Sequence, residues 1–183
     1  MIDPKELLFT VDENNNPIEP VARGIAHSKA IWHRATDVWV VNGTKVLCQQ
    51  RSLKKDTNPG KWQTNFGGHA APGQSYVSCA KQELFEETGI DLPEKAFRQV
   101  LIYKNTQDEP ERNFADREHL GAFMVSWKGS VEDLKTEEDE VEQVVWKEAV
   151  DILKEFNPES WANHGYEKNL LSKIATGKNW GEL

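Results

Sequence analysis

The chain has 183 residues, of which 38% are hydrophobic and 28% charged, and its formal net charge is −8. This length and composition predict a single globular domain over residues 1–183 with a sizeable core, and not a disordered chain. The negative charge argues against nucleic acid as a partner, because broad contact with a phosphate backbone needs basic surfaces. A polyanionic small molecule would therefore need metal ions or a local group of basic side chains.

The sequence gives no sign of export or of a membrane partner. No apolar run approaches the length that crosses a bilayer, and residues 1–6 lack the basic and apolar regions of a signal peptide. With only Cys48 and Cys79, a disulfide framework is not expected. We therefore expect a cytoplasmic protein.

The first third of the chain reads mostly as strands. An opening hairpin is predicted over residues 5–24, with a turn-forming cluster at 12–17, and a short helical turn can follow within 24–31. Residues 35–41 and 45–51 predict two strands that are joined at Asn42-Gly43, a sequence typical of a two-residue hairpin.

The polar segment 52–61 leads through a short predicted strand at 62–66 to Gly67-Gly68. One reading is a solvated connection broken at Pro59-Gly60. The other reading is a loop that faces an anionic substrate, because several basic side chains precede the glycines. The candidate substrate-binding residues are Arg51, Lys54, Lys55 and Lys61.

A helix is predicted between Ser75 and Gly89. The serine hydroxyl can accept a hydrogen bond from a free amide of the first turn, and a glycine can adopt the left-handed conformation that ends a helix. Glu83, Glu86 and Glu87 stand at i, i+3 and i+4, so their carboxylates share one face. Their mutual repulsion makes physical sense if a divalent cation lies among them, although a merely solvated face is the alternative.

The second half alternates strands with loops and ends in helices. Strands are predicted at 97–105, 118–127 and 141–146, with a loop at 106–116 and the acidic run 137–140 before the last strand. Helices are predicted at about 147–156 and 159–175, separated by Asn157-Pro158, so that the C-terminal helices span about 147–175.

The loop-helix-loop at 68–90 resembles the motif of the Nudix superfamily. That motif is a glycine, five residues, Glu, seven residues, Arg-Glu, an aliphatic residue, any residue, Glu-Glu, any residue, glycine and an aliphatic residue. The chain matches it at Gly68, Glu83, Leu84, Glu86, Glu87, Gly89 and Ile90. It departs from the motif at Gln74, where the first Glu is expected, and at Gln82, where the Arg is expected.

The resemblance implies a fold and a chemistry. The expected fold class is α/β, a Nudix-like α/β/α sandwich with a mixed central sheet. The expected chemistry is attack of water on a diphosphate with the help of Mg²⁺ or Mn²⁺. The implied metal ligands are Glu83, Glu86, Glu87 and the carbonyl of Gly68 or Gly67. The implied catalytic residues are the same three glutamates with Glu118, for which Asp139 and Glu140 are competitors.

The two departures from the motif can be explained together. In the family the first Glu and the Arg are thought to pair and orient the helix. An amide can donate and accept, so Gln74 and Gln82 can bond to each other without leaving a charge unpaired. Alternatively, the two changes mark a weak or inactive enzyme.

A narrower resemblance points to the branch that includes type I isopentenyl diphosphate isomerase and related hydrolases. In the isomerase a second metal is held by three His and two Glu, and a Cys and a Glu move the proton. Carried over by position, a second divalent metal would be held by His33, His69, Asp116 and Glu118. His27 is a candidate for the third His, although its spacing is one residue short. His27, His119 and His164 are otherwise expected to be structural or exposed.

Gly67 stands at the position of the catalytic Cys, so the isomerase chemistry lacks its thiol. The leading hypothesis is therefore a Nudix hydrolase that cleaves a diphosphate bond in a nucleotide or other organic diphosphate. The alternatives are an isomerase of isopentenyl diphosphate and a catalytically silent domain that binds a diphosphate. The expected partner is a small-molecule diphosphate, and a homodimer is left open.

Overall fold

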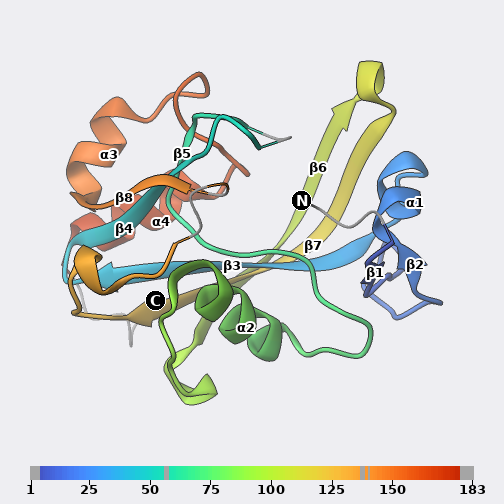
Figure 1. The fold of residues 1–183 in the computed structure, drawn as a ribbon, viewed down its shortest axis with the longest axis horizontal. Coiled ribbons are helices and arrows are strands. Elements are labelled where there is room, and N and C mark those ends of the chain that lie inside the picture. The colour runs from blue at the N-terminus through green and yellow to red at the C-terminus, as the bar shows by residue number, and fades with distance from the viewer. Residues whose placement is uncertain (1–4, 56–57, 137–138, 140, 178–183) are drawn as a thin grey trace.

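The computed structural model describes residues 5–55, 58–136, 139 and 141–177. A six-stranded sheet forms the centre of the molecule, with one helix on one face and two helices on the other (Figure 1). These helices are α2 (Tyr76–Thr88), α3 (Ala149–Glu155) and α4 (Glu167–Ala175). The α/β/α sandwich expected from the sequence is therefore confirmed.

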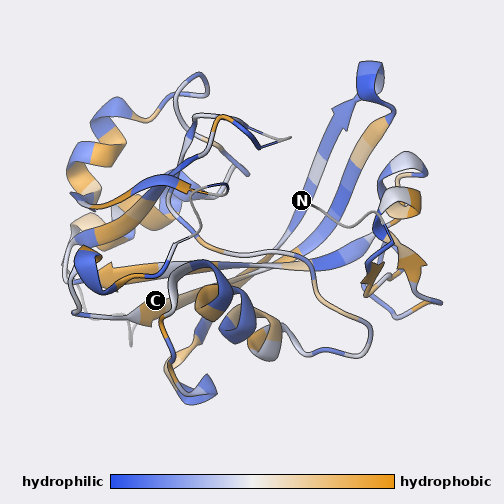
Figure 2. Cartoon of the chain, viewed as in Figure 1, coloured by the Kyte–Doolittle hydropathy of each residue, from blue (hydrophilic) through white to orange (hydrophobic). Residues whose placement is uncertain are grey.

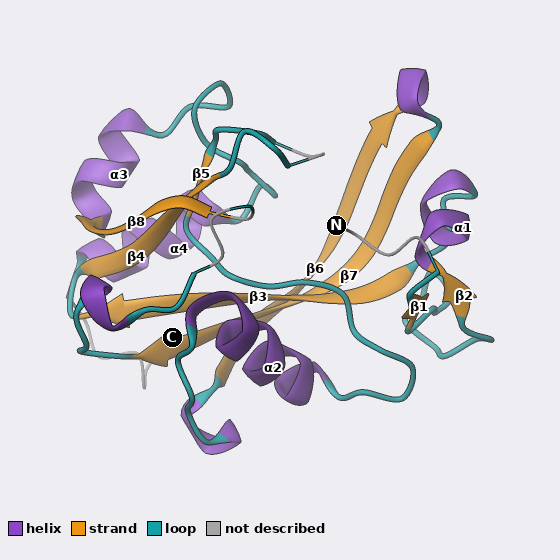
Figure 3. Ribbon diagram, in the orientation of Figure 1, coloured by secondary structure: helices purple, strands orange, loops and turns teal. Residues whose placement is uncertain are grey.

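The central sheet is mixed, because β3 and β7 run parallel while the other neighbours are antiparallel (Figure 3). The order is β5 (Trp62–Gln63), β4 (Lys45–Arg51), β3 (His33–Asn42), β7 (Phe114–Ser126) and β6 (Arg98–Glu109), and β8 (Val141–Glu148) pairs with the other edge of β4. The smaller elements are β1 (Leu7–Leu8), β2 (Val21–Ala22), α1 (Arg23–Ser28) and three 3₁₀ turns at Glu94–Ala96, Pro110–Arg112 and Val131–Asp133.

Strands β3 and β4 separate soon after their hairpin, and this separation positions the site. They pair only at Val41–Val46 and Asn42–Lys45, after which β4 pairs with β5. The chain then crosses to the free edge of β3, where Val38 bridges to Phe66 and Thr36 N donates to the Gly68 carbonyl at 2.9 Å. The glycines of the motif therefore lie along the middle of β3.

Side chains alternate between the two faces of the sheet, and each face has its own core. On β3, Trp39 and Val41 pack with Ile152, Leu171 and Ile174 on the side of α3 and α4. Val38 and Val40 pack on the other side with the apolar residues of α2, namely Ala80 and Leu84. Ala35, Thr36 and Asp37 come before these core residues on β3 and line the cleft described below.

The motif helix begins and ends where the sequence predicts. The Ser75 side chain accepts a hydrogen bond from Ser78 N at 3.2 Å, and Gly89 adopts the left-handed conformation at φ +74°. Caps of this kind each contribute about 1 kcal/mol to helix stability. Thr88 is fully buried and its hydroxyl donates to the Leu84 carbonyl, so the last turn of α2 is tied to the core.

The expected loop at 106–116 is wrong. The residues instead extend β6 and β7 into a long hairpin arm whose tip is the turn at Pro110–Arg112 (Figure 1). Arg117 Nη2 lies 2.7 Å from Asp108 Oδ1 across the two strands. The arm carries mostly hydrophilic residues (Figure 2), so its composition resembles that of a loop although its backbone is paired.

The expected helix over 159–175 is also wrong in its first half, because α4 begins only at Glu167. Asn157 Oδ1 accepts from the amides of Glu159 and Ser160, and Gly165 adopts φ +96°. This irregular segment places Trp161, which is 2% exposed, 6.0 Å from the ring of Trp62. The irregular backbone of this segment, and not a helix, therefore places the Trp161 ring against Trp62 of the sheet.

The predicted N-terminal hairpin is present but shorter than expected, since β1 and β2 contain two residues each. The predicted helical turn after it is α1. Within the part of the chain that the structure describes, no helix is both long enough and apolar enough to cross a bilayer. Of the acidic run 137–140, only Asp139 lies within the described residues.

Candidate active site

A cleft of about 680 Å³ opens beside β3, a size typical of ligand-binding pockets. Its walls come from several elements that are far apart in the sequence. The lining is predominantly polar, and its charged or titratable members are Glu6, Arg23, His27, Asp37, Arg51, Lys55, His69, Glu83, Glu86, Glu87, Arg112, Asp116, Glu118 and His164.

Two glutamates of α2 enter this cleft beside the Gly67-Gly68 backbone. Glu87 Oε2 accepts a hydrogen bond from Gly67 N at 2.9 Å. A Cβ at Gly68 would lie 2.6 Å from Glu83 Oε2, so a side chain at this position would push the carboxylate away from the backbone. Glu86 also lines the cleft but is exposed.

The electrostatics of these carboxylates fit a cation. Burial and the charge of Glu86 raise the pKa of Glu83 to about 7, and burial and the charge of Glu83 raise the pKa of Glu87 to about 8. Crowded acids with raised pKa values are held against their mutual repulsion. Oxygen ligands of this kind suit Mg²⁺ or Mn²⁺, and Glu83, Glu87 and the Gly68 carbonyl could hold such an ion.

The predicted amide pair is confirmed. Gln74 Nε2 donates to Gln82 Oε1 at 2.9 Å, Gln82 Nε2 donates to Glu86 Oε1 at 2.8 Å, and Gln74 Oε1 accepts from Ala71 N at 2.9 Å. These hydrogen bonds connect the loop to the helix without an ion pair. Gln82 also orients Glu86, which the sequence did not suggest.

The basic residues divide into two groups. Arg51 and Lys55 line the cleft, and their positive charges act to lower the pKa of Glu87. Lys54 instead pairs with Asp139, and Lys61 Nζ donates to the Pro158 carbonyl at 2.8 Å. Neither Lys54 nor Lys61 is part of the cleft lining.

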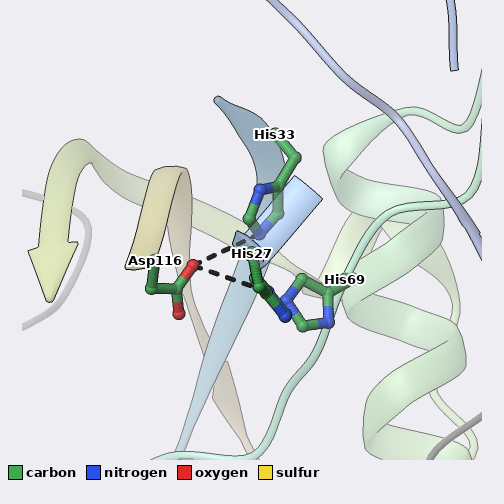
Figure 4. A group of neighbouring side chains, drawn as sticks. All are labelled: His27, His33, His69 and Asp116. Atoms are coloured by element: carbon green, nitrogen blue, oxygen red, sulfur yellow. Dashed lines mark ion pairs between the residues drawn. The ribbon is translucent and has the colours of Figure 1, made fainter. Parts of the chain in front are cut away.

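A second group of side chains that could hold a metal ion meets at His27, His33, His69 and Asp116 (Figure 4). His27 comes from α1, His33 from β3, His69 from the segment along β3, and Asp116 from β7. Their ligand atoms all lie within 4.8 Å of one another. His27 was expected to be structural or exposed, or a third ligand with irregular spacing. The structure places His27 in the group, because α1 packs against β7. The number of residues between His27 and His33 therefore does not prevent the two rings from meeting.

The atoms of this histidine cluster (His27, His33, His69 and Asp116) fit a metal ion. His27 Nε2, His33 Nε2 and Asp116 Oδ1 are buried without hydrogen-bond partners among the described residues. His33 Nδ1 lies 3.0 Å from the Ile31 carbonyl, a contact that fixes the ring so that Nε2 faces Asp116 Oδ1 at 3.4 Å. Imidazole and carboxylate together suit Zn²⁺ or Mn²⁺.

The pKa values in the histidine cluster depart from the usual range. Burial lowers the pKa of His27 to about 4, and burial together with the charge of His33 lowers that of His69 well below its usual value. Burial also opposes ionisation of His33 and Asp116, but their mutual pairing at 3.4 Å outweighs it, raising the pKa of His33 and lowering that of Asp116. His27 and His69 are therefore neutral beside an ionised carboxylate, whereas His33 has to release its proton before a cation can bind to its ring nitrogen.

Glu118 lies between the histidine cluster and β6. Its Oε1 is 3.7 Å from His69 Nε2, and its Oε2 accepts from Asn105 Nδ2 at 2.9 Å. Burial and the charge of Asp116 raise its pKa to about 7. Among the competing acids, Asp139 is 77% exposed and pairs with Lys54, and Glu140 lies outside the described residues. Glu118 is therefore the acid beyond α2 that the fold brings to the cleft.

Glu6, Arg23, Asp37, Arg112 and His164 line the cleft but were not assigned to the site from the sequence. Asp37 and His164 line the cleft together, with His164 Nδ1 3.4 Å from Asp37 Oδ2. A charged residue within the apolar strand 35–41 was the available signal for Asp37. His164 had no local signal, because the segment that carries it was assigned to a helix.

Gly67 has no room for a side chain. A Cβ built there would lie 1.9 Å from the Thr36 carbonyl oxygen, which is part of the β3 backbone. Placing a cysteine at this position would require the two backbones to move apart. Within the described residues the thiols of Cys48 and Cys79 are buried, and burial raises their pKa values, to about 12 for Cys79.

A protein-family model of the NUDIX domain matches residues 31–165, a span that contains the acidic helix and most of the cleft. The chain belongs to the Nudix family. It is 34% identical over 99 residues to an isopentenyl-diphosphate Delta-isomerase of Photorhabdus laumondii, covering 54% of this chain and 56% of that protein. It is 40% identical over 86 residues to an uncharacterized Nudix hydrolase of Yersinia pestis, covering 46% and 47%.

The matched region thus spans about half the length of these two Nudix relatives. The fold resembles a solved structure from Deinococcus radiodurans with a TM-score of 0.69 at 15% identity, covering 92% of this chain and 99% of that one. At this identity the likeness concerns the fold alone. The relatives include both isomerases and hydrolases, so family membership by itself does not choose between the two reactions.

Proposed function

We propose that this Nudix domain is a divalent-metal-dependent hydrolase that cleaves a diphosphate bond in a nucleotide or other organic diphosphate. The observation that carries the proposal is the placement of Glu83 and Glu87 against the Gly67-Gly68 backbone inside the cleft. Arg51 and Lys55 lie in the same cleft. Such a cleft can hold both a cation and the phosphates that the cation neutralises.

The residues present fit a metal at two places. Glu83, Glu87 and the Gly68 carbonyl, with Glu86 at the rim, would hold Mg²⁺ or Mn²⁺, and the histidine cluster with Glu118 would hold a second ion. When bound, such ions neutralise the negative charge that builds up on the phosphates and lower the pKa of a water ligand. Arg51 and Lys55 would bind the phosphate oxygens from the side, which orients the bond to be broken.

The chain also supplies groups that can move a proton. A general base works best when its pKa lies near the working pH. Glu118 has a pKa raised to about 7 when no cation binds it, and Asn105 holds its carboxylate in place. We assign Glu118 as the residue that accepts the proton of the attacking water, and Glu87 as the main ligand and second candidate.

The histidine cluster is the observation that favours the isomerase as an alternative, since three His and two acids meet as they do in the isomerase resemblance. Gly67 opposes it, because the position has neither a thiol nor the space for one. A catalytically silent domain is supported only by Gln74 and Gln82, whose hydrogen bond to each other keeps the loop and helix connected.

The test is a screen of wild-type protein with Mg²⁺ and then Mn²⁺ against nucleoside di- and triphosphates, dinucleotides, sugar nucleotides and isopentenyl diphosphate. The expected result is release of phosphate or a nucleotide that EDTA abolishes and that Glu87→Gln reduces strongly. The matched control is Glu142→Gln, which removes an exposed carboxylate on β8 away from the cleft. Tight binding without turnover of any substrate would contradict the hydrolase. Exchange of solvent deuterium into isopentenyl diphosphate would support the isomerase instead.

A further inference from the structure

Asp37 and His164 form the centre of a polar cluster that the metal chemistry does not use. Asp37 Oδ2 accepts hydrogen bonds from Tyr166 and from Asn65 Nδ2, the latter at 3.1 Å. His164 Nδ1 lies 3.4 Å from the same oxygen and 3.3 Å from Oε1 of Glu167, which is 1% exposed. Asp37 and His164 both line the cleft.

The cluster lies close to the Gly67 backbone, beside which the phosphates of a substrate are proposed to bind. A Cβ at Gly67 would lie 3.1 Å from the Asp37 Cα, and Gly67 N is the group that holds Glu87. Asp37 is four residues from His33 on the same face of β3, a separation of about 13 Å along a strand. The cluster therefore lies beside the Gly67 backbone that holds Glu87, and the charge of His164 also reaches Asp116 and Glu118. The organic part of a diphosphate held between these acids would come within reach of the cluster.

Among the atoms of Asp37 and His164, one acceptor and one donor are left without a partner on the side of the cleft in the part of the chain that the structure describes. All the contacts of the Asp37 carboxylate are made by Oδ2, and Oδ1 has no partner among the described residues. The ring of His164 directs Nδ1 at the two carboxyl groups, so Nε2 on the other side of the ring points away from them. The side chain of His164 is 21% exposed, and its accessible part lies in the cleft.

The charge of His164 makes it a strong donor. Burial alone would lower the pKa of His164, but the negative charges of Asp37 and Glu167 outweigh burial and raise the pKa well above its usual value. Hydrogen bonds from a charged donor are about twice as strong as those between neutral groups.

A purely structural role explains this arrangement poorly. Removing two carboxyl groups and an imidazole from water is unfavourable, and apolar residues of similar volume are often equally stable or more stable in such places. Trp39 and Val41 on the same face of β3 show that the neighbouring core accepts apolar side chains. An isoprenoid tail bound here would pack against the charged groups of Asp37 and His164, which is an unfavourable environment for an apolar chain.

We propose that Asp37 and His164 form a subsite that binds neighbouring hydroxyl groups on the organic part of the diphosphate substrate. His164 Nε2 donates to one hydroxyl oxygen and Asp37 Oδ1 accepts from the next hydroxyl, so the substrate is a sugar-bearing diphosphate and not a prenyl diphosphate. The inference rests on the proposed hydrolase function and adds the class of substrate. The sugar is either the ribose of a nucleotide or a hexose joined to its diphosphate.

The first experiment removes hydroxyls from the probe and leaves the protein unchanged. The kcat/KM of wild type is measured for the common ribonucleoside 5′-diphosphates against their 2′,3′-dideoxy counterparts, and for UDP-glucose against UDP-2-deoxyglucose. A lost hydrogen bond to a charged group should lower kcat/KM by about tenfold to a hundredfold. A loss confined to the first pair identifies ribose, and a loss confined to the second identifies a hexose. Equal rates within both pairs would overturn the subsite.

The second experiment changes the protein. His164→Leu and Asp37→Asn should reduce the discrimination between a hydroxylated probe and its deoxy form to less than threefold, while His164→Gln, which keeps a donor, retains part of it. His119→Gln is the matched control, because His119 faces the opposite side of β7 and does not line the cleft. It should discriminate as wild type does. Full discrimination by His164→Leu would overturn the assignment.

A binding measurement separates this inference from the proposed function. Isothermal titration with the same probe pairs in Ca²⁺, which supports binding without requiring turnover, gives the ratio of Kd values. Preferential binding of the hydroxylated probe without hydrolysis in Mg²⁺ or Mn²⁺ supports the subsite and contradicts the hydrolase. Hydrolysis without any preference in Kd or kcat/KM supports the hydrolase and overturns the subsite.

Discussion

The cleft contains two candidate metal-binding groups that differ in origin. The carboxylates of Glu83, Glu86 and Glu87 come from a single helix, and their spacing is fixed by the helical turn. The four ligands of the histidine cluster come from four separate segments, and their ligand atoms still meet within 4.8 Å. The first group is a local property of the sequence, whereas the second exists only because the sheet and α1 are folded.

The two groups also differ in charge. Glu83 and Glu87 repel each other and have raised pKa values, so without a cation they tend to hold protons. In the histidine cluster, His27 and His69 have lowered pKa values and Asp116 is ionised, so these three present lone pairs even without a cation, whereas His33 has a raised pKa and gives up its proton when a cation binds. This contrast predicts a hard, weakly held ion at the carboxylates and a more tightly held transition metal at the histidines.

The largest expected effect comes from the acids that handle water. Glu87→Gln should lower kcat by about 10²–10⁴-fold, the usual contribution of a group that holds or deprotonates the nucleophile. Glu118→Gln should lower kcat by a similar factor, because the proposed reaction needs Glu118 as well as the carboxylates of α2. Steady-state kinetics of both variants at saturating Mg²⁺, beside Glu142→Gln, check this. A normal kcat in Glu118→Gln would confine the chemistry to α2.

Removal of one histidine should separate the two metals. His33→Ala should weaken Mn²⁺ or Zn²⁺ binding at the histidine cluster by at least 10–100-fold, the loss typical even of a supporting partner of a metal ligand. Metal content after dialysis, measured by mass spectrometry, should fall by one equivalent, with the Mg²⁺ dependence of activity changed less. His119→Gln is the control that removes a histidine outside the cluster. An unchanged metal content in His33→Ala would refute a second ion.

The pH dependence of stability should distinguish the carboxylates. The pKa of Glu87 in the folded protein, about 8, lies above its usual value of 4.5, so its contribution to stability is fully present below pH 4.5 and is lost as pH rises through 8. In EDTA, the Tm of wild type should therefore fall more than that of Glu87→Gln between pH 5 and pH 8.5. Each kcal/mol corresponds to about 2–4 °C in a protein of this size. Mg²⁺ should restore the Tm at high pH in wild type only.

The smallest expected effect concerns the amide pair. Gln82→Arg alone should not improve stability or activity, because the guanidinium would face the amide of Gln74 and lose the present bond. Gln74→Glu combined with Gln82→Arg should be tolerated within about 1 kcal/mol, the range of exposed ion pairs. Urea unfolding and kcat of the single and double variants test this. A clear gain from the single change would contradict the pairing.

Features set by residues close together in the sequence could be predicted. The helix from Ser75 to Gly89, its three glutamates and the bond between Gln74 and Gln82 depend on contacts within about one helix length. Their geometry follows from 3.6 residues per turn and from hydrogen-bonding chemistry, and needs no knowledge of the rest of the fold. The strands of the central sheet were also predicted, because both faces of the sheet are buried and the strands are therefore rich in apolar residues.

Features set by pairings between distant segments could not be predicted in the same way. The arm of β6 and β7 has polar side chains on paired backbone, so composition indicated a loop. His27 entered the cluster through the packing of α1 on β7, and His164 reached Asp37 because residues 157–166 leave the helical path.

The sequence by itself therefore determined the family, the acidic helix and the absence of a thiol at Gly67. The tertiary structure decided which other side chains share the cleft with that helix. It set Arg51 and Lys55 apart from Lys54 and Lys61, and it brought Asp37 together with His164. The physical reason is that spacing along one helix fixes local neighbours, while the neighbours of a cleft are fixed by strand register and packing across the whole domain.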